Sequence, residues 1–443
     1  MDDSGKAKPG PQGVMPFETT LVSGVPELAG SSAKPRVAEP QRNQGVIRFE
    51  MPANTLAPDH VARVLWEVVG TLDLRRFLVG AKAVAGKAGR RTLSPRMKLT
   101  LWLYAISMGI GSARAIARLV TSDDAYRWIA GDLEVGHHTL SSFRVDHGAA
   151  LETLMTDILA SLMHKGLLCL ALVAQDGIRI RAAATAPSFR GLESLQECRE
   201  QAALHLKATL AQADDPELTD GQKAAREAAA RDFQRRVEEA ISTVQELQKT
   251  RGPSDKPARA STTDTEARVM KMADGGFRPA FNVQMATAGS PLGGVRTIVG
   301  VRVTNVGSDM GSITPMLDEI ERRTGALPTV LLADANHASH PCIRTATEQG
   351  VEVLIAVPKR SKQPGANADK DPAIVAWRAR METDEAKKLY RARASLCELM
   401  NAHLRTHHGV NEFLVRGIAK VTCVVLLAAI ASNVLQHASA LLA

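Results

Sequence analysis

The spacing of apolar residues divides the chain into a helical part and a mixed part. Between 46 and 165 the apolar positions recur every three or four residues, as in "HVARVLWEVVGTL", and this spacing predicts a series of amphipathic helices. From about residue 166 onward, short apolar runs alternate with helical segments, which predicts an α/β domain containing a parallel strand pair. The strand-like runs are 167–175, 281–288, 295–305, 329–334 and 351–357.

A polar, alanine-rich segment at 193–252 interrupts the α/β pattern. It carries two apolar stripes, one from Leu195 to Ala213 and one from Ala225 to Leu247, each with the helical period of about 3.6 residues. Thr219 and Gln222 precede the second stripe at the spacing of a capping box. We therefore expect an antiparallel helical hairpin inserted into the α/β domain.

The two ends of the chain predict a leader and a buried helix. Residues 1–45 are rich in Gly, Pro and Ser without apolar periodicity, which predicts a disordered leader. The most apolar segment, 421–435, is too short to span a bilayer comfortably, and no apolar signal segment begins the chain. The expected domains are a leader at 1–45, a helical domain at 46–165, and an α/β domain at 166–436 that the hairpin at 193–252 interrupts.

The charge of the chain favours a polyanionic partner, and its cysteines favour a reducing compartment. The five cysteines form no C-x-x-C pair and are odd in number, which is typical of free thiols in the cytoplasm. The formal net charge is +8, and between Asp73 and Asp123 ten Lys and Arg residues occur with no Asp or Glu. We expect no membrane contact and a cytoplasmic, nucleoid-associated protein.

The basic interval lies on short helices separated by Gly and Ser, a pattern that resembles a helix-turn-helix DNA reader. A solvated basic face on an ordinary helical bundle is the alternative interpretation. We favour DNA contact, because so many cations without neutralising acids produce an extended positive field. The residues expected to contact DNA from this region are Arg90, Arg91, Arg96, Lys98, Arg114, Arg118 and Arg144.

Three carboxylates have positions from which they could form one site. Asp176 and Asp334 each end a strand-like apolar run, and Glu398 lies in a later predicted helix. Carboxylates from distant segments can converge to hold divalent cations, which prefer hard oxygen ligands. Most aspartates at strand ends are capping or loop residues, however, so the spacing alone leaves both interpretations open.

Further evidence comes from segments that occur in a fixed order along the chain. They are "SPRMKLTLWLYAISMGIGSARAIARL", "QDGIRIRAAA" around Asp176, "STTDTEARVMKMADGGFRPAFNVQ", "LLADANHASH" around Asp334, "YRARASLCELMNAHLR" around Glu398 and "NEFLVRGIAKVTCVVLLAAIASNVL". Together they resemble the bacterial insertion-sequence DDE transposases with a Y-R-E-K signature. Tyr390, Arg393, Glu398 and Arg405 fall at the Tyr, Arg, Glu and Lys positions of that signature.

The resemblance implies a ribonuclease-H-like catalytic domain that cuts and joins DNA with two Mg²⁺ (or Mn²⁺) ions. It implies that Asp176 lies on the first strand, Asp334 after the fourth, and Glu398 on a helix packed against the sheet. These three would be the catalytic residues and metal ligands. The residues expected to hold DNA near them are Tyr390, Arg393, Arg405, Arg179 and Arg181.

The implied partners are the inverted-repeat ends of the protein's own element and a target DNA, bound by a homodimer or higher oligomer. The chain departs from the family pattern at Asn336-His337, Cys397, Leu399 and Arg405. Two alternative functions remain open at this point. One is a non-catalytic or decayed DNA-binding protein of the same fold, and the other is a related metal nuclease that cuts without joining.

Overall fold

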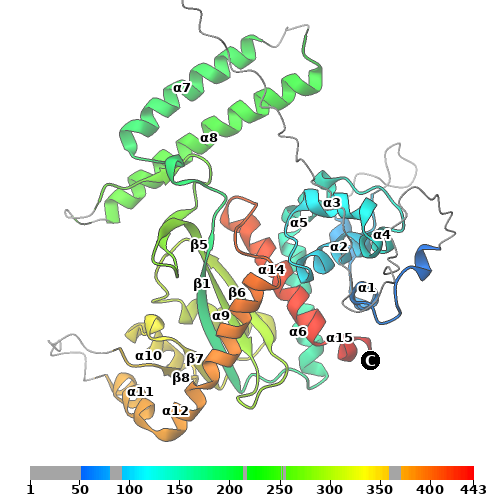
Figure 1. The fold of residues 1–443 in the computed structure, drawn as a ribbon. Helices are drawn as coiled ribbons and strands as arrows, with labels where there is room; N and C mark the ends of the chain where they lie inside the picture. The colour runs from blue at the N-terminus through cyan, green and yellow to red at the C-terminus, as the bar shows by residue number, and fades with distance from the viewer. Residues whose placement is uncertain (1–50, 80–91, 213–216, 251, 253–255, 359–370) are drawn as a thin grey trace, which may run out of the picture. The chain divides into compact units, whose positions relative to one another are not determined.

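The computed structural model describes residues 51–79, 92–212, 217–250, 252, 256–358 and 371–443 (Figure 1). The predicted leader at 1–45 lies outside the described residues, as do Arg90 and Arg91. Helices precede the first strand, as the apolar spacing predicted: α1 (Val61–Thr71), α2 (Pro95–Ser107), α3 (Ala113–Ser122), α4 (Asp124–Ala130), α5 (His137–Asp146) and α6 (Gly148–His164). Short 3₁₀ turns occupy Pro52–Asn54, Arg75–Leu78, Ala186–Ser188 and Ala335–His337.

The mixed part of the chain forms one six-stranded sheet whose central strand is β1 (Leu172–Arg181). On one side β1 pairs in antiparallel fashion with β5 (Phe277–Ala288), which in turn pairs with both β4 (Arg268–Lys271) and β6 (Thr297–Thr304). On the other side β1 is parallel to β7 (Val330–Ala333), and β7 is parallel to β8 (Glu352–Ile355). The five predicted strand-like runs therefore form the body of this sheet.

The boundary of the first strand differs from the prediction. The apolar run was expected to begin at 167 and to end at Asp176, whereas β1 begins at Leu172 and continues through Asp176 to Arg181. The strand continues because β5 pairs with it as far as Arg181, while the parallel pairing with β7 ends at Ala174. Asp176 thus lies where one edge of β1 loses its partner, although the strand itself does not end there.

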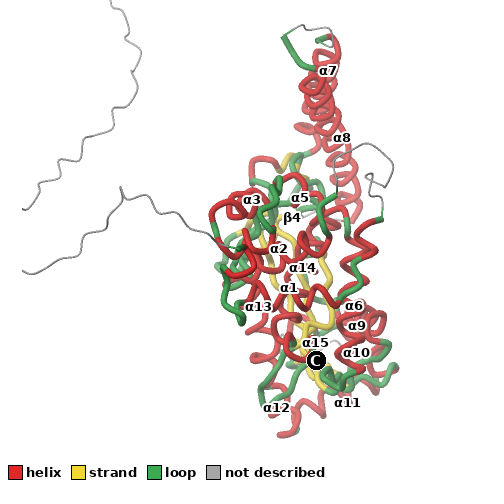
Figure 2. Tube along the Cα trace, turned by 90° about the vertical axis from the view of Figure 1, so that its right-hand side faces the viewer, coloured by secondary structure: helices red, strands yellow, loops and turns green. Residues whose placement is uncertain are grey.

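Helices cover both faces of the sheet, as Figure 2 shows. On one face α9 (Ile313–Thr324) and α10 (His340–Glu348) contribute apolar residues to the main core. On the other face a smaller core joins β1, β7 and β8 to α12 (Asp384–Tyr390) and to the π-helical turn Ala394–Glu398. The chain also forms α11 (Pro372–Glu382) before α12, and α13 (Leu399–Thr406) directly after the π turn.

The apolar segment near the C-terminus is the buried helix α14 (Ile418–Gln436), followed by α15 (Ala438–Leu442). By length and composition α14 could cross a membrane, but most of it is buried because it packs against β6 and against α2, α5 and α6 (Figure 1). Asn433 on α14 is fully buried. Its amide accepts a hydrogen bond from the Ile298 N–H (2.9 Å) and donates one to the Ile298 carbonyl (2.8 Å), so that it satisfies the backbone of β6 as a neighbouring strand would.

The helical part also meets the end of α13 at a close backbone crossing. A Cβ placed on Gly409 would lie 2.2 Å from the Gly109 carbonyl oxygen, and Gly409 has a φ of +66°. Beside this crossing the buried His408 hydrogen-bonds the Ile106 carbonyl (3.3 Å), and burial lowers its pKa to about 4. Side chains including Trp102 and Arg144 line an adjoining cavity of about 380 Å³.

The alanine-rich segment forms two helices, α7 (Leu192–Ala211) and α8 (Asp220–Thr250), which pack against each other. Their contact buries Leu195 and Cys198 against Val237, Ile241 and Val244. The Thr219 N–H donates to the Gln222 side chain (2.9 Å), and the Gln222 N–H donates to Thr219 Oγ1 (3.3 Å), which confirms the predicted capping box. A two-stranded sheet, β2 (Phe189–Arg190) with β3 (Ala260–Ser261), lies at the base of the pair.

Candidate active site

Asp176 and Asp334 are brought together by the register of two parallel strands. Ala174 lies opposite Leu332, so extending this register by two residues places Asp176 beside Asp334, which directly follows β7. Burial raises the pKa of Asp176, and repulsion from the Asp334 carboxylate adds to this effect. The sequence prediction that two distant aspartates meet is consistent with this arrangement.

Three hydrogen bonds hold the Asp334 carboxylate. It accepts from the Asn336 N–H (3.1 Å) and the Asn336 side-chain amide (2.8 Å), and its third partner is His337 Nδ1. Burial works to raise the pKa of Asp334, but the bonds from His337 and Asn336 outweigh it, and the net pKa is lowered. The Asn336-His337 pair, a departure from the family pattern, therefore fixes an ionised carboxylate.

Asp176 has a partner that the sequence did not suggest. The buried side chain of Asn401 on α13 donates its amide to Asp176 Oδ2 (2.9 Å), and the Gly177 N–H donates to Oδ1 (2.9 Å). Asn401 follows Glu398 by three residues, a spacing that places two side chains on one side of a helix. This spacing was the only available signal, and asparagine on a predicted helix gave no chemical reason to select it.

Glu398 is oriented differently from the two aspartates. Its side chain is 51% exposed and forms an ion pair with Arg393, whose side chain is only 17% exposed. Burial acts to lower the pKa of Arg393, but its ionisable neighbours Cys397, Tyr390, Glu398 and Asp176 outweigh burial, and the net pKa is raised. A π-helical turn ends at Glu398, and π turns occur often at functional sites.

The positions of Asp176 and Asp334, two of the three acids, fit the binding of a divalent cation. Asp176 and Asp334 present adjacent oxygen donors, and a cation would relieve their mutual repulsion. In the part of the chain that the structure describes, no three His, Cys, Asp or Glu side chains converge closely enough to hold a metal ion. Glu398 would have to leave Arg393 and turn inward to complete such a site.

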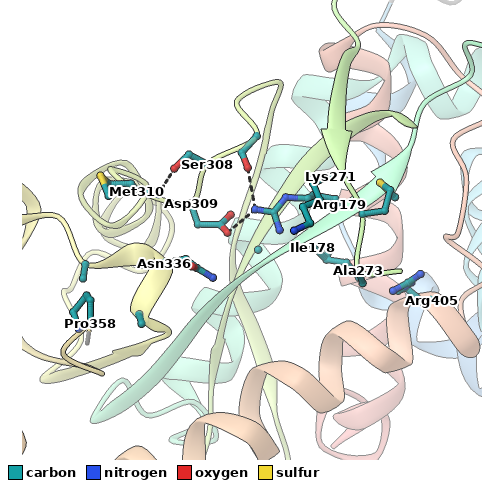
Figure 3. Close-up of a pocket in the computed structure, with 15 residues that line it drawn as sticks. Ile178, Arg179, Lys271, Ala273, Ser308, Asp309, Met310, Asn336, Pro358 and Arg405 are labelled. Atoms are coloured by element: carbon teal, nitrogen blue, oxygen red, sulfur yellow. Dashed lines mark hydrogen bonds and ion pairs between the residues drawn. The ribbon is translucent and has the colours of Figure 1, made fainter. Parts of the chain in front are cut away.

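Figure 3 shows an open cleft next to the chain segments that carry the two aspartates, and its volume is about 760 Å³. Gly177, Ala335 and Asn336, all next to the acids in sequence, form part of its wall. Its cationic side chains are Arg179 on β1, Lys271 on β4 and Arg405 on α13. Asp309 also lines the cleft and pairs with Arg179, so Lys271 and Arg405 are the two described lining cations not paired with a carboxylate that a polyanion would meet there.

The two arginines on β1, Arg179 and Arg181, have different partners. Arg179 donates to the buried Asp309 (2.9 Å) and to the Gly307 carbonyl (2.9 Å), whereas the 54% exposed Arg181 pairs with Glu412 at 3.6 Å. Asp309 also accepts from the amides of Asn282 and Gln284, so it is the centre of a buried polar cluster beneath β1. Tyr390 is half-buried, and the Arg393 guanidinium lies 5.8 Å from its ring centre.

Three of the basic residues expected to contact DNA from the helical part have partners inside the protein. Arg144 is buried, donates to the Gly111 carbonyl (2.7 Å) and lies over the Trp102 ring, and burial lowers its pKa to about 10. Lys98 is buried over Phe143, and Arg96 is half-buried over Trp66, whose carbonyl accepts its hydrogen bonds. The charged groups of these three residues are engaged by the protein itself, so the structure gives no support to the expectation that they contact DNA.

Comparison with protein-family models connects both parts of the chain to one activity. A model described as "Transposase domain (DUF772)" matches residues 53–146, and a model described as "Transposase DDE domain" matches residues 345–438. The chain belongs to the DDE transposases of insertion sequences. Searches of curated proteins and of solved structures found no match.

The transposase therefore cuts and joins DNA, and the alternative of a non-catalytic binding protein is not favoured. The DDE match includes Glu398 and α14 but neither aspartate, so the assignment of Asp176 and Asp334 depends on geometry. Two of the family-like segments contact each other at the start of α14. The Gly417 N–H donates to Asp264 (3.2 Å) and the Ile418 N–H donates to Glu266 (2.8 Å), which satisfies two of the free donors at the start of the helix.

Proposed function

We propose that Asp176, Asp334 and Glu398 are the catalytic carboxylates of this transposase and that they bind two Mg²⁺ or Mn²⁺ ions. The observation that carries the proposal is the parallel register that places Asp176 beside Asp334 at the mouth of a cationic cleft. When bound, such ions activate the attacking oxygen and stabilise the leaving oxygen of a phosphodiester. Asn401, Asn336 and His337 are positioning residues that orient the two aspartates.

The sheet supports a ribonuclease-H-like fold for the catalytic part. Leaving the short β4 aside, the strands follow the order β6-β5-β1-β7-β8, with the first three antiparallel and the last two parallel to β1. Asp176 is then on the first strand, Asp334 follows the fourth, and Glu398 lies in a helical segment packed against β1. These are the positions that the family resemblance implies.

Arg393 connects the acids to the Y-R-E-K signature. Its guanidinium forms an ion pair with Glu398. Once cations neutralise the three acids, the Arg393 guanidinium would be free to bind a DNA phosphate. Arg405 is exposed and lines the cleft, where it can hold a phosphate further from the acids. Tyr390 supports Arg393 through the face of its ring.

Removal of divalent metal tests this function directly. On a plasmid carrying the ends of the element, we expect nicking and strand transfer with Mg²⁺, and neither product in excess EDTA. Restoring Mg²⁺ should restore both products. Nicking without joined product would instead support the metal nuclease, and DNA binding without either product would support the non-catalytic protein.

We propose that the exposed face of α3 contacts the ends of the element. Arg114 and Arg118 lie one helical turn apart and are exposed, whereas Arg96, Lys98 and Arg144 are engaged inside the protein. Binding of the two ends by a homodimer or higher oligomer remains a prediction. The N-terminal helices and the cleft would then contact separate parts of one DNA molecule.

Changing Arg114 and Arg118 to glutamine should weaken DNA binding without changing the fold. Each phosphate contact contributes close to one unit to the slope of log affinity against log salt, so we expect the slope to fall by about two. Fluorescence anisotropy over a salt series measures this slope. Arg127→Gln is the matched control, since Arg127 is already neutralised by Asp124 and Asp132; an unchanged slope in the double variant would move the contact elsewhere.

A further inference from the structure

The hairpin between β4 and β5 places an aromatic side chain in solvent beside the cationic cleft. Among the residues that the structure describes, Phe277 is the one exposed Phe, Tyr or Trp side chain, with 69% of its surface accessible. An exposed ring is not unusual by itself, but one beside a cationic cleft offers a flat face on which a planar ligand can stack. The question is which ligand this ring would meet.

The side chains of Phe277 and Lys271 project from the same face of the hairpin. They lie directly opposite each other in the antiparallel register, and opposed residues project to the same side of a sheet. Lys271 lines the cleft, together with Arg179 and Arg405. No carboxylate pairs with Lys271 among the described residues, so its charge is available to a phosphate.

The hairpin is also firmly held, so the ring is presented in one place. Its turn is closed by a hydrogen bond from the Met272 N–H to the Gly276 carbonyl (2.7 Å), and Gly275 adopts a φ of +81° that favours glycine. Asp274 accepts from the Gly276 N–H (3.0 Å) and pairs with Arg278 at 2.7 Å. A rigid platform of this kind loses little entropy when it binds.

From these observations we infer that the tip of the β4–β5 hairpin is a binding subsite for an unpaired DNA base, with Phe277 stacking on the base and Lys271 holding the adjacent phosphate. This inference rests on the proposed DNA channel and adds a contact for single-stranded or distorted DNA. Stacking is sequence-tolerant because every base has a flat apolar face, so the subsite would recognise distortion rather than sequence.

The register also limits where this contact falls on the DNA. Met285 lies opposite Asp176, and Phe277 is eight residues further along the same strand. At about 3.3 Å per residue the separation is at most roughly 26 Å. At about 3.4 Å per base step this is at most about eight nucleotides from the scissile phosphate.

The test compares two DNA probes in EDTA, where no cleavage occurs. One probe is a 30-bp duplex and the other is the same duplex with a central bubble of four unpaired bases. We expect the full-length protein to bind the bubbled probe about tenfold more tightly, since stacking on one base supplies that preference. Phe277→Ala should remove the preference, Phe277→Tyr should keep it, and Lys271→Gln should weaken binding to both probes.

Leu292→Ala is the matched control, because Leu292 is a 96% exposed apolar residue outside the cleft. It should bind both probes as the wild type does. The inference is overturned if the wild type binds both probes equally, or if Phe277→Ala retains the preference. The assay does not depend on the metal site: Asp334→Asn should retain the preference, so failure of the catalytic assignment and failure of this subsite give different results.

Discussion

Replacing Asp334 with asparagine should abolish Mg²⁺-dependent cleavage while leaving DNA binding largely intact. Asparagine has nearly the same shape and can still accept the Asn336 N–H bond, but it carries no charge to hold a cation. Metal ions supply several kcal/mol of transition-state stabilisation, so we expect a loss of at least about 1000-fold in the nicking rate. Nicking of a supercoiled plasmid carrying the element's ends measures this rate.

Two comparisons make the result specific. Asp318→Asn removes an exposed carboxylate from α9, away from the cleft, and should nick at the wild-type rate. Asn401→Leu removes the amide that orients Asp176 and should give an intermediate loss, because both aspartates proposed to bind metal remain. If Asp334→Asn cleaves as fast as the wild type, Asp334 is not a metal ligand, and the pairing of Asp176 with Asp334 has another purpose.

The sequence was most informative where local chemistry determines the result. The helical stripes, the Thr219–Gln222 capping box and the strand preceding Asp334 all depend on neighbouring residues, and the structure has each of them. The end of β1 was misjudged because it is set by a distant partner. The acid at 176 and the basic residues after it looked like a strand terminus, but pairing with β5 continues the strand through both.

The same distinction applies to the candidate site residues. Arg96 and Lys98 belong to the acid-free interval, and in the sequence such cations are equivalent to Arg114 and Arg118. The tertiary fold separates them, since the first two lie over aromatic rings whereas the second two are exposed to solvent. Asn401 was missed for the converse reason, because its importance comes only from its contact with an aspartate 225 positions away.

Replacing Gly409 with alanine should destabilise the protein more than any other glycine-to-alanine change at a comparable backbone conformation. The new methyl group would lie 2.2 Å from the Gly109 carbonyl oxygen and 2.8 Å from its carbonyl carbon, and neither backbone atom can rotate away. The positive φ of Gly409 adds the usual strain of about 1–2 kcal/mol for an L side chain. Relieving the clash requires the end of α2 to separate from the turn after α13.

Gly166 provides a matched control for this change. Its φ of +69° is nearly that of Gly409 (+66°), yet no atom lies within 4 Å of the position a Cβ would take. Gly166→Ala therefore reports the conformational strain alone, and Gly409→Ala should cost a further 1–3 kcal/mol, about the magnitude of overpacking in a filled core. Chemical denaturation of the two variants and the wild type measures the difference.

The loss of stability in Gly409→Ala should come with local loosening of the structure around the backbone crossing. Separation at this crossing would expose the buried His408 and its hydrogen bond to the Ile106 carbonyl. Amide hydrogen exchange near the end of α2 and at 408–410 should therefore accelerate in Gly409→Ala and stay unchanged in Gly166→Ala. Equal stability and equal exchange in both variants would show that the backbone crossing does not join the N-terminal helices to the catalytic part.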